Sequence, residues 1–194
     1  MDALKDRIIN DGQILAGDIL KVDSFLNHQV DTAFLTEIGR EFAKRFSDCE
    51  VTKILTIEAS GIAVGFATSQ FFNHCPIVFA KKGQASNMGN DVYFAKEHSF
   101  THNQDLVIAV SKKYLHKEDK ILILDDFLAN GEALKALLAI CAQAECEVVG
   151  AGIVIEKAYM KGGKELRDQG VRIESLARIN SMSVENGIEF CSEN

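Results

Sequence analysis

The chain has 194 residues, of which 47% are hydrophobic and 25% charged, and its formal net charge is −7. A chain of this length buries about 70% of the surface that it exposes when unfolded, so a single domain needs neither disulfides nor a structural metal. The acidic balance argues against nucleic acid as a partner, because recognition of a phosphate polymer needs a dense basic face. A small phosphorylated ligand is still allowed, since backbone amides and a few lysines can bind it locally.

The cysteines and the first residues indicate the compartment. Five cysteines form an odd set without a Cys-x-x-Cys pair, and the opening MDALKDR is too charged for a secretory signal. Apolar runs such as DLVIAV are far shorter than the roughly 18 residues of a membrane span. We therefore expect a reduced, cytoplasmic protein that does not enter a membrane.

The N-terminal part carries one clear helical pattern. From Val30 to Phe46 apolar side chains repeat on one helical face, at Leu35, Ile38 and Phe42. Residues 1 to about 50 and about 160 to 194 fall outside the strand and helix repeat that fills the middle of the chain. We expect these two segments to form a small hood beside a core of about residues 50–160, all within a single domain of residues 1–194.

Apolar, β-branched runs after residue 50 predict five strands. They are residues 52–58, 76–80, 105–110, 120–126 and 148–157. A helix-length segment separates the first two runs, and an apolar stripe of Leu134, Leu137, Leu138 and Cys141 marks a helix between the last two. This alternation predicts an α/β fold with a doubly wound, mainly parallel sheet. Ligands of such sheets bind at the carboxyl ends of the strands.

Two polar segments interrupt this pattern. Residues 83–104 are polar and poorly periodic, which in a compact domain indicates a functional lid or a long hairpin. His98 and His102 lie there without a third ligand nearby, so we expect no metal site made by the protein alone. The stretch KGGKEL at residues 161–166 resembles a phosphate loop only superficially, and a turn before a short helix is the better interpretation.

The most informative stretch is ILILDDFLANGEALKAL, residues 121–137. Asp125 and Asp126 end an aliphatic strand, and two adjacent carboxylates repel each other unless a diol, a metal or a cation holds them. The loop that follows offers backbone amides at a helix start, where Gly131 lets the chain approach a ligand and Asn130 can donate or accept. The alternative is a solvated pair of helix-capping residues. Four preceding aliphatic residues favour the ligand site.

Two other strand ends carry groups suited to an anion. Lys81 and Lys82 can place an ammonium over a diphosphate, although a solvated strand end explains them equally well on the residues alone. Ser60 and Gly61 can cap a helix, and the same geometry offers amides to an anion. Neither a Walker A loop nor a complete dinucleotide fingerprint occurs in the chain.

A hydrophobic run, two acids, an apolar pair and a loop of small residues together resemble the signature of the type I phosphoribosyltransferases. The segment TIEASGIAVG is similar to the pyrophosphate loop of that family, and VFAKK is similar to its next strand. The segments KVDSFLNHQVD, DDFLANG and GIVIEK resemble the bacterial members of the family that use xanthine. The resemblance implies transfer of ribose 5-phosphate from phosphoribosyl pyrophosphate to xanthine, a reaction of purine salvage that yields xanthosine 5′-monophosphate and pyrophosphate.

The resemblance also implies roles for individual residues. Asp125 and Asp126 are expected to be catalytic. Phosphoribosyl pyrophosphate is expected to contact Glu58, Ala59, Ser60, Gly61, Lys81, Ala129, Asn130, Gly131, Glu132 and Ala133. Xanthine is expected to contact Leu20, Asn27, Phe127, Lys157 and Tyr159.

The same resemblance implies a cofactor and an assembly. Mg2+ is expected to bind mainly through oxygens of phosphoribosyl pyrophosphate, and a homodimer is expected in which Lys81 reaches the neighbouring subunit's site. The alternative is a non-catalytic regulator that senses a purine or phosphoribosyl pyrophosphate with the same fold. The first 50 residues are short for the DNA-binding segment that such a regulator needs, so we expect an enzyme.

Overall fold

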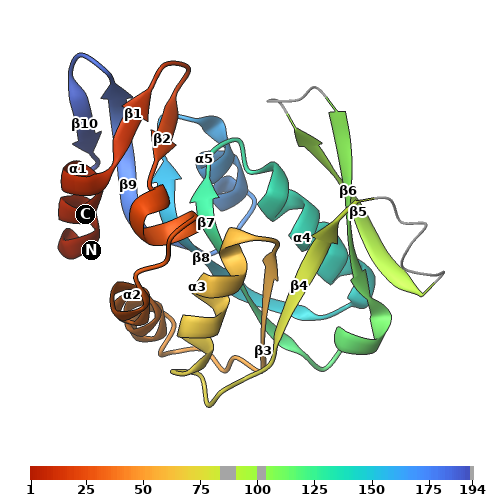
Figure 1. Cartoon of the computed structure of the whole chain (residues 1–194). Helices are drawn as coiled ribbons and strands as arrows, with labels where there is room; N and C mark the ends of the chain where they lie inside the picture. The colour runs from red at the N-terminus through yellow and green to blue at the C-terminus, as the bar shows by residue number, and fades with distance from the viewer. Residues whose placement is uncertain (84–90, 100–103, 193–194) are drawn as a thin grey trace.

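The computed structural model describes residues 1–83, 91–99 and 104–192 (Figure 1). The helices and helical turns are α1 (Asp2–Asp11), η1 (Asp23–Asn27), α2 (Thr32–Arg45), α3 (Ser60–Ser69), η3 (Lys112–Tyr114), α4 (Glu132–Ala144) and α5 (Lys161–Asp168). The strands are β1 (Gln13–Leu15), β2 (Ile19–Lys21), β3 (Lys53–Ile57), β4 (Ile77–Lys82), β5 (Val92–Ser99), β6 (Gln104–Ser111), β7 (Lys120–Leu128), β8 (Glu147–Lys157), β9 (Ile173–Ser183) and β10 (Gly187–Phe190).

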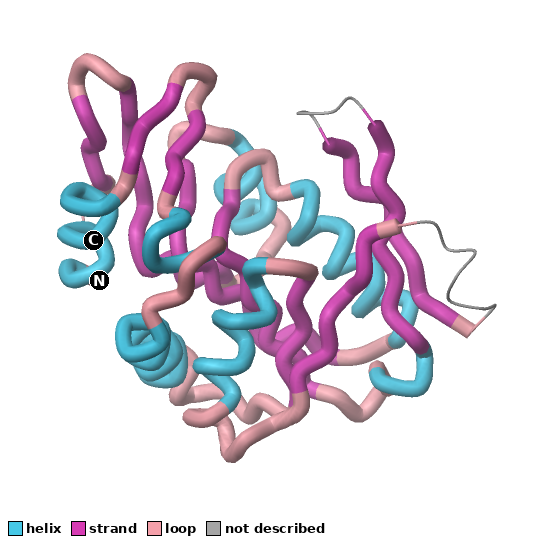
Figure 2. Tube along the Cα trace, viewed as in Figure 1, coloured by secondary structure: helices cyan, strands magenta, loops and turns pink. Residues whose placement is uncertain are grey.

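An eight-stranded sheet in the order β10-β9-β8-β7-β3-β4-β6-β5 forms the centre of the molecule (Figure 2). From β9 to β4 neighbouring strands are parallel, while β10, β6 and β5 are antiparallel to their neighbours. The predicted α/β fold with a mainly parallel sheet is therefore confirmed. A separate hairpin of β1 and β2 stands beside the sheet.

The alternation of side chains along the strands divides the core into two layers, as a sheet covered on both faces requires. Leu122 and Leu124 of β7 pack with residues of α1, α2 and α3, whereas Ile121 and Ile123 pack with α4. Figure 1 shows α2 and α3 on one side of the sheet and α4 and α5 on the other.

The two helices that the sequence predicts are present, and each buries its apolar stripe against the sheet. In α2, Ile38 and Phe42 are fully buried, and the Asp31 side chain caps the helix by accepting from the Phe34 amide at 3.1 Å. In α4, Leu134, Leu137 and Cys141 of the predicted stripe are buried.

The C-terminal segment adds strands to the sheet that the sequence pattern did not predict. Residues 173–183 form β9, which pairs in parallel with β8 and so extends the sheet instead of only covering it. Its sequence IESLARINSMS mixes polar and apolar residues, which hides the strand in a search for aliphatic runs. The division of the chain into a core and a hood stays a prediction.

A buried ion pair fixes α5 to β8 and β9. The Glu156 carboxylate accepts from both terminal nitrogens of Arg167 at 2.7 and 2.8 Å and from the Ser175 hydroxyl at 2.6 Å. Burial alone raises the pKa of Glu156, but these hydrogen bonds and the nearby cations lower the pKa below its ordinary value. The carboxylate therefore stays ionised, and it holds the C-terminal turn of α5 against β8 and β9.

The segment predicted as a lid or hairpin is described only in part. Within it, β5 pairs antiparallel with β6 from Val92 opposite Ser111 to Ser99 opposite Gln104. Residues 84–90 and 100–103, among them His102, lie outside the described residues.

Candidate active site

A cavity of about 300 Å³ lies where β3, β4 and β7 end. Its lining residues are Ile57, Glu58, Ala59, Ser60, Gly61, Lys82, Asp125, Asp126, Phe127 and Ala133. Because parallel strands present their carboxyl ends at one edge, segments that are far apart in sequence meet there. The cavity brings together the predicted acid pair and the predicted pyrophosphate loop.

The acid pair combines one buried and one accessible carboxyl group. Asp125 is 7% exposed, and one of its oxygens accepts from the Asp126 backbone amide at 2.9 Å. Burial and the neighbouring Asp126 charge raise the pKa of Asp125 well above its ordinary value. The pair is thus primed to bind hydroxyl groups or a positive charge, either of which relieves the repulsion between the acids.

The turn from β3 into α3 lies close to β7. A Cβ atom on Gly61 would lie 1.9 Å from the Thr56 hydroxyl, which donates to the Leu124 carbonyl at 2.7 Å. A glycine at this position therefore allows the start of α3 to approach the acid pair. The Glu58 carboxylate accepts from the Lys82 backbone amide at 2.6 Å, which ties this turn to β4.

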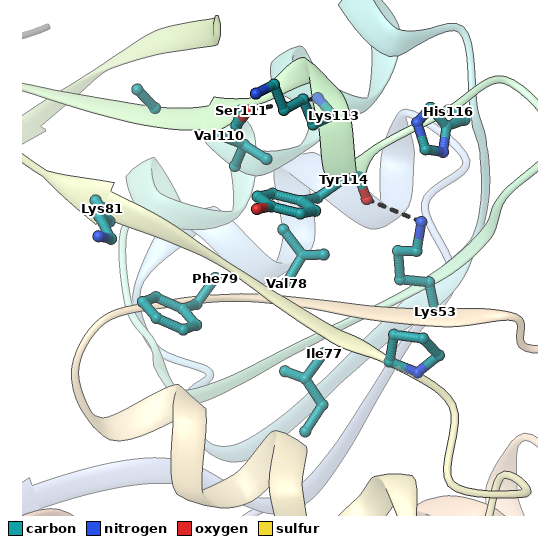
Figure 3. Close-up of a pocket in the computed structure, with 12 residues that line it drawn as sticks. Lys53, Ile77, Val78, Phe79, Lys81, Val110, Ser111, Lys113, Tyr114 and His116 are labelled. Carbon is teal, nitrogen blue, oxygen red and sulfur yellow. Dashed lines mark hydrogen bonds between the residues drawn. The ribbon is translucent and has the colours of Figure 1, made fainter. Parts of the chain in front are cut away.

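The two lysines at the end of β4 lie on different faces of the sheet, because neighbouring residues of a strand point in opposite directions. Lys82 lines the cavity with the acid pair. Lys81, the lysine predicted to bind pyrophosphate, lines a second cavity of about 620 Å³ together with Phe79 and Tyr114 (Figure 3). The described structure therefore separates Lys81 from the acid pair of its own chain.

The loop between β7 and α4 is held from behind by α5. Gly131 adopts the left-handed conformation with φ 81° and caps α4, so that the first amides of α4 are available to an anion. The Gly162 amide donates to the Ala129 carbonyl at 3.2 Å. A Cβ atom on Gly162 would lie 2.3 Å from the carbonyl carbon of Asn130. Gly162 near the start of α5 thus supports the loop, and α5 begins directly at Lys161.

The remaining residues of the predicted loop differ in environment. Ala133 lines the cavity, whereas the Glu132 carboxylate turns to Lys135 at 3.2 Å. Asn130 is partly buried, and no hydrogen bond of its side chain is recorded among the described residues.

The predicted base-binding residues fall into two groups. Asn27 reaches the acid pair, where its amide donates to Asp126 at 3.2 Å, and Phe127 lines the cavity. Lys157 instead donates to the Asp18 carbonyl at 2.5 Å, and Tyr159 is 39% exposed. Burial lowers the pKa of Lys157, which weakens its hold on the proton.

The hairpin of β1 and β2 lies beside the second group, since Lys157 donates to its Asp18 carbonyl. Leu20, which is 7% exposed, belongs to β2, and Asp18 lies in the turn with φ 59°. Burial and then the Asp18 charge raise the pKa of Tyr159. Asp18 was missed by sequence reasoning, although an aspartate after glycine in a short turn is a typical left-handed residue.

The described residues set limits on other site classes. Among the side chains that the structure describes, in the ranges 1–83, 91–96 and 107–192, no group of three or more His, Cys, Asp or Glu is placed to hold a metal ion. No helix in the described part of the chain has the length and apolarity to cross a membrane.

Solved structures that resemble this fold include adenine phosphoribosyltransferases. The enzyme of Giardia lamblia in complex with 9-deazaadenine gives a TM-score of 0.74 at 22% identity, with 90% of this chain and 97% of that chain covered. The enzyme of Rhodothermus marinus gives 0.73 at 18% identity, with 92% and 99% covered. At these identities the likeness establishes the fold, which is the type I phosphoribosyltransferase fold.

Sequence relatives are much more similar, although no protein-family model matches the chain. Xanthine phosphoribosyltransferase 2 of Clostridium botulinum is 53% identical over 94% of this chain and 96% of its own length. Xanthine phosphoribosyltransferase of Clostridioides difficile is 52% identical over 96% and 97%. Xanthine phosphoribosyltransferase 1 of Clostridium perfringens is 50% identical over 98% and 100%. The chain belongs to the xanthine phosphoribosyltransferase family.

Proposed function

We propose that this chain transfers ribose 5-phosphate from phosphoribosyl pyrophosphate to xanthine, and so forms xanthosine 5′-monophosphate and pyrophosphate in purine salvage. The observation that carries the proposal is the carboxylate pair of Asp125 and Asp126 between two helix starts. Each helix start offers amides to an anion, and phosphoribosyl pyrophosphate has a phosphate at one end of its ribose and a diphosphate at the other. Relatives at 50% identity or more carry the name of this activity over nearly the whole chain.

The acid pair acts on the ribose in this proposal. When the bond between the anomeric carbon and pyrophosphate breaks, positive charge develops on the ribosyl ring. Asp126, at the surface of the cavity, and the buried Asp125 balance that charge and bind the two ribose hydroxyls. Groups that are already in place before the reaction stabilise such charge without further reorganisation.

The two loops hold the ends of the substrate. Residues 129–133 at the start of α4 bind the 5-phosphate through backbone amides, with Gly162 fixing the loop from behind. Residues 58–61 at the start of α3 bind pyrophosphate. Lys82 lines the same cavity and adds a positive charge beside the departing group.

The hood segment and the end of β8 recognise the base. The Asn27 amide, which donates to Asp126 in the structure, donates to the 2-oxo group of xanthine when the base is bound. Likewise, Lys157 leaves the Asp18 carbonyl and donates to the 6-oxo group. Phe127 packs on a ring face, with Leu20 and Tyr159 closing the pocket. An amino group in place of the 6-oxo group would meet a second donor, so adenine is rejected.

Mg2+ is the metal that fits these residues. The carboxylates that line the cavity are hard oxygen groups of the kind that Mg2+ prefers, but the described residues form no metal cage, so the ion would bind mainly through waters and the oxygens of phosphoribosyl pyrophosphate. Bound with the diphosphate, the ion would neutralise the charge of the leaving group.

A homodimer and a cytoplasmic location complete the proposal. Phe79 and Tyr114, at 38% and 61% exposure, flank the cavity that contains Lys81 (Figure 3). A second subunit that covers this apolar surface would give Lys81 a path to the neighbouring pyrophosphate site. Sedimentation of the active species as a monomer would contradict the dimer. The cysteine pattern supports the reduced cytoplasm.

Product analysis tests the reaction. The purified protein is incubated with phosphoribosyl pyrophosphate, Mg2+ and one base at a time, and nucleotide and pyrophosphate are measured together. We expect both products in equal amounts with xanthine and neither with adenine. A protein that binds both substrates but forms no nucleotide would instead be the non-catalytic regulator.

A further inference from the structure

Helix α4 ends in a Schellman motif whose two contact positions are both cysteines. The Cys146 amide donates to the Cys141 carbonyl, and the Glu145 amide donates to the Ala142 carbonyl, each at 3.2 Å. Glu145 adopts the left-handed conformation with φ 56° between them. In this motif the side chains of the two outer residues contact each other, commonly as an apolar pair. Here the pair consists of two thiols.

The geometry brings these thiols within reach of a covalent bond. With standard backbone dimensions, the 3.2 Å contact limits the distance between the two Cα atoms to about 7 Å at most. Disulfides span Cα distances of about 4.4 to 6.8 Å. The Cys146 sulfur also lies 3.5 Å from the Cys141 carbonyl oxygen, to which it donates. The side chains therefore need little backbone movement to join.

The two thiols differ in access and in acidity. Cys141 is 1% exposed, whereas Cys146 is only partly buried. A hydrogen bond from the Cys141 thiol lowers the pKa of Cys146 against the opposing effect of burial, and the same bond raises the pKa of Cys141. Elsewhere, burial raises the pKa of the Cys49 and Cys75 thiols. Of the two thiols in this motif, Cys146 is thus the one that a reagent meets first.

We propose that Cys141 and Cys146 form a reactive dithiol that a small-molecule disulfide converts to an intramolecular disulfide. The Cys146 thiolate attacks one sulfur of the reagent, so that a mixed disulfide forms and one reagent thiolate leaves. The Cys141 sulfur then attacks Cys146, a second reagent thiolate leaves, and the two leaving groups take up the two protein protons. The protein loses two hydrogens, and the reagent is reduced to two thiols.

Peptide mapping after treatment with cystamine tests the proposal on the unmodified chain. Trypsin cleaves after Lys135 and Lys157, so residues 136–157 form one peptide that contains Cys141 and Cys146 and no other cysteine. We expect this peptide to lose two hydrogens before Cys49 or Cys75 is modified. A peptide 136–157 that stays reduced, or that keeps bound cysteamine, would overturn the proposal.

Two variants separate the roles of the thiols. In Cys141→Ser the second step is blocked, so cysteamine should remain attached to Cys146. In Cys146→Ser the peptide should remain unmodified while Cys141 stays buried. A triple variant of Cys49, Cys75 and Cys191 to serine is the control and should form the disulfide at the rate of the unmodified chain. A large loss of rate in the triple variant would refute direct formation between Cys141 and Cys146.

Discussion

Substitution of Gly162 by alanine tests whether α5 positions the phosphate loop for catalysis, as distinct from merely stabilising the fold. The new Cβ atom would lie 2.3 Å from the Asn130 carbonyl carbon and 2.5 Å from both the Ala129 oxygen and the Gly131 nitrogen. All three are backbone atoms, which no change of rotamer can move aside. The loop or the start of α5 must therefore shift, and a shift of the loop moves it toward the place where the 5-phosphate is proposed to bind.

The size of the effect follows from the size of the shift. Ordinary contact of a Cβ atom begins near 3.4 Å, so the loop or the start of α5 must move by about 1 Å. A misplacement of about 1 Å in a substrate-positioning group can cost on the order of 100-fold in rate. That factor corresponds to about 2.7 kcal/mol of transition-state stabilisation.

The assay is kcat/KM for phosphoribosyl pyrophosphate at saturating xanthine, measured beside the melting temperature. Gly163→Ala is the matched control, because its Cβ would lie 2.2 Å from a Glu156 carboxylate oxygen and 2.9 Å from an Arg167 nitrogen, which are side-chain ends. We expect Gly163→Ala to lower mainly the melting temperature and Gly162→Ala to lower mainly kcat/KM. A folded Gly162→Ala protein with the kcat/KM of the wild type would refute the role of this loop.

Three further predictions concern base choice, acidity and the buried ion pair. Asn27→Leu should lower kcat/KM for xanthine more than for hypoxanthine, with a difference that corresponds to about 1 to 3 kcal/mol of transition-state stabilisation, whereas Lys157→Met should lower kcat/KM for both bases. Steady-state rates with the two bases check this, and equal losses for Asn27→Leu would contradict it. The folded state raises the pKa of Asp125 above 3.8, so at a pH between the unfolded and folded pKa values the folded protein binds more protons than the unfolded chain. The free energy of unfolding therefore falls as pH rises through that interval. Asp125→Asn should therefore gain most in melting temperature over the wild type at neutral pH and least below pH 3.8, and a uniform gain would contradict the pKa shift. Glu156→Gln should lower the free energy of unfolding at neutral pH by about 3 kcal/mol, since it removes the buried charge that pairs with Arg167 and Arg178. Because the folded state lowers the pKa of Glu156, the loss should shrink as pH falls below 4.5, and denaturant unfolding at several pH values measures both effects.

The sequence indicates the centre of this fold better than its borders. The aliphatic runs of β3, β7 and β8 are buried on both faces, so hydrophobicity alone reveals them. In β9, exposed Arg178 and Asn180 alternate with buried Ala177 and Ile179, and the strand is defined by its pairing with β8 rather than by its own composition. Pairing between strands that are distant in sequence leaves no pattern in a single sequence as clear as the aliphatic runs of β3, β7 and β8.

The same limit applies to the site. Asp125 and Asp126 could be predicted because they belong to a local pattern, an aliphatic strand followed by two acids. The family resemblance led us to Lys81, whereas Lys82 lines the cavity with the acid pair, because the side chain that enters it depends on which face of β4 meets the cavity. The support that Gly162 gives to the loop depends on a contact between residues about 30 positions apart in the chain, which the pattern KGGKEL does not contain.

The central claim is that the acid pair stabilises charge on the ribose during transfer, and the turnover number of the acid variants tests it most directly. Asp125→Asn and Asp126→Asn keep the shape of each side chain and remove its charge. With xanthine, phosphoribosyl pyrophosphate and Mg2+ at saturation, we expect kcat to fall on the order of 100-fold in each variant, or about 3 kcal/mol, while both proteins stay folded. A folded double variant that forms xanthosine 5′-monophosphate at the rate of the wild type would contradict the account.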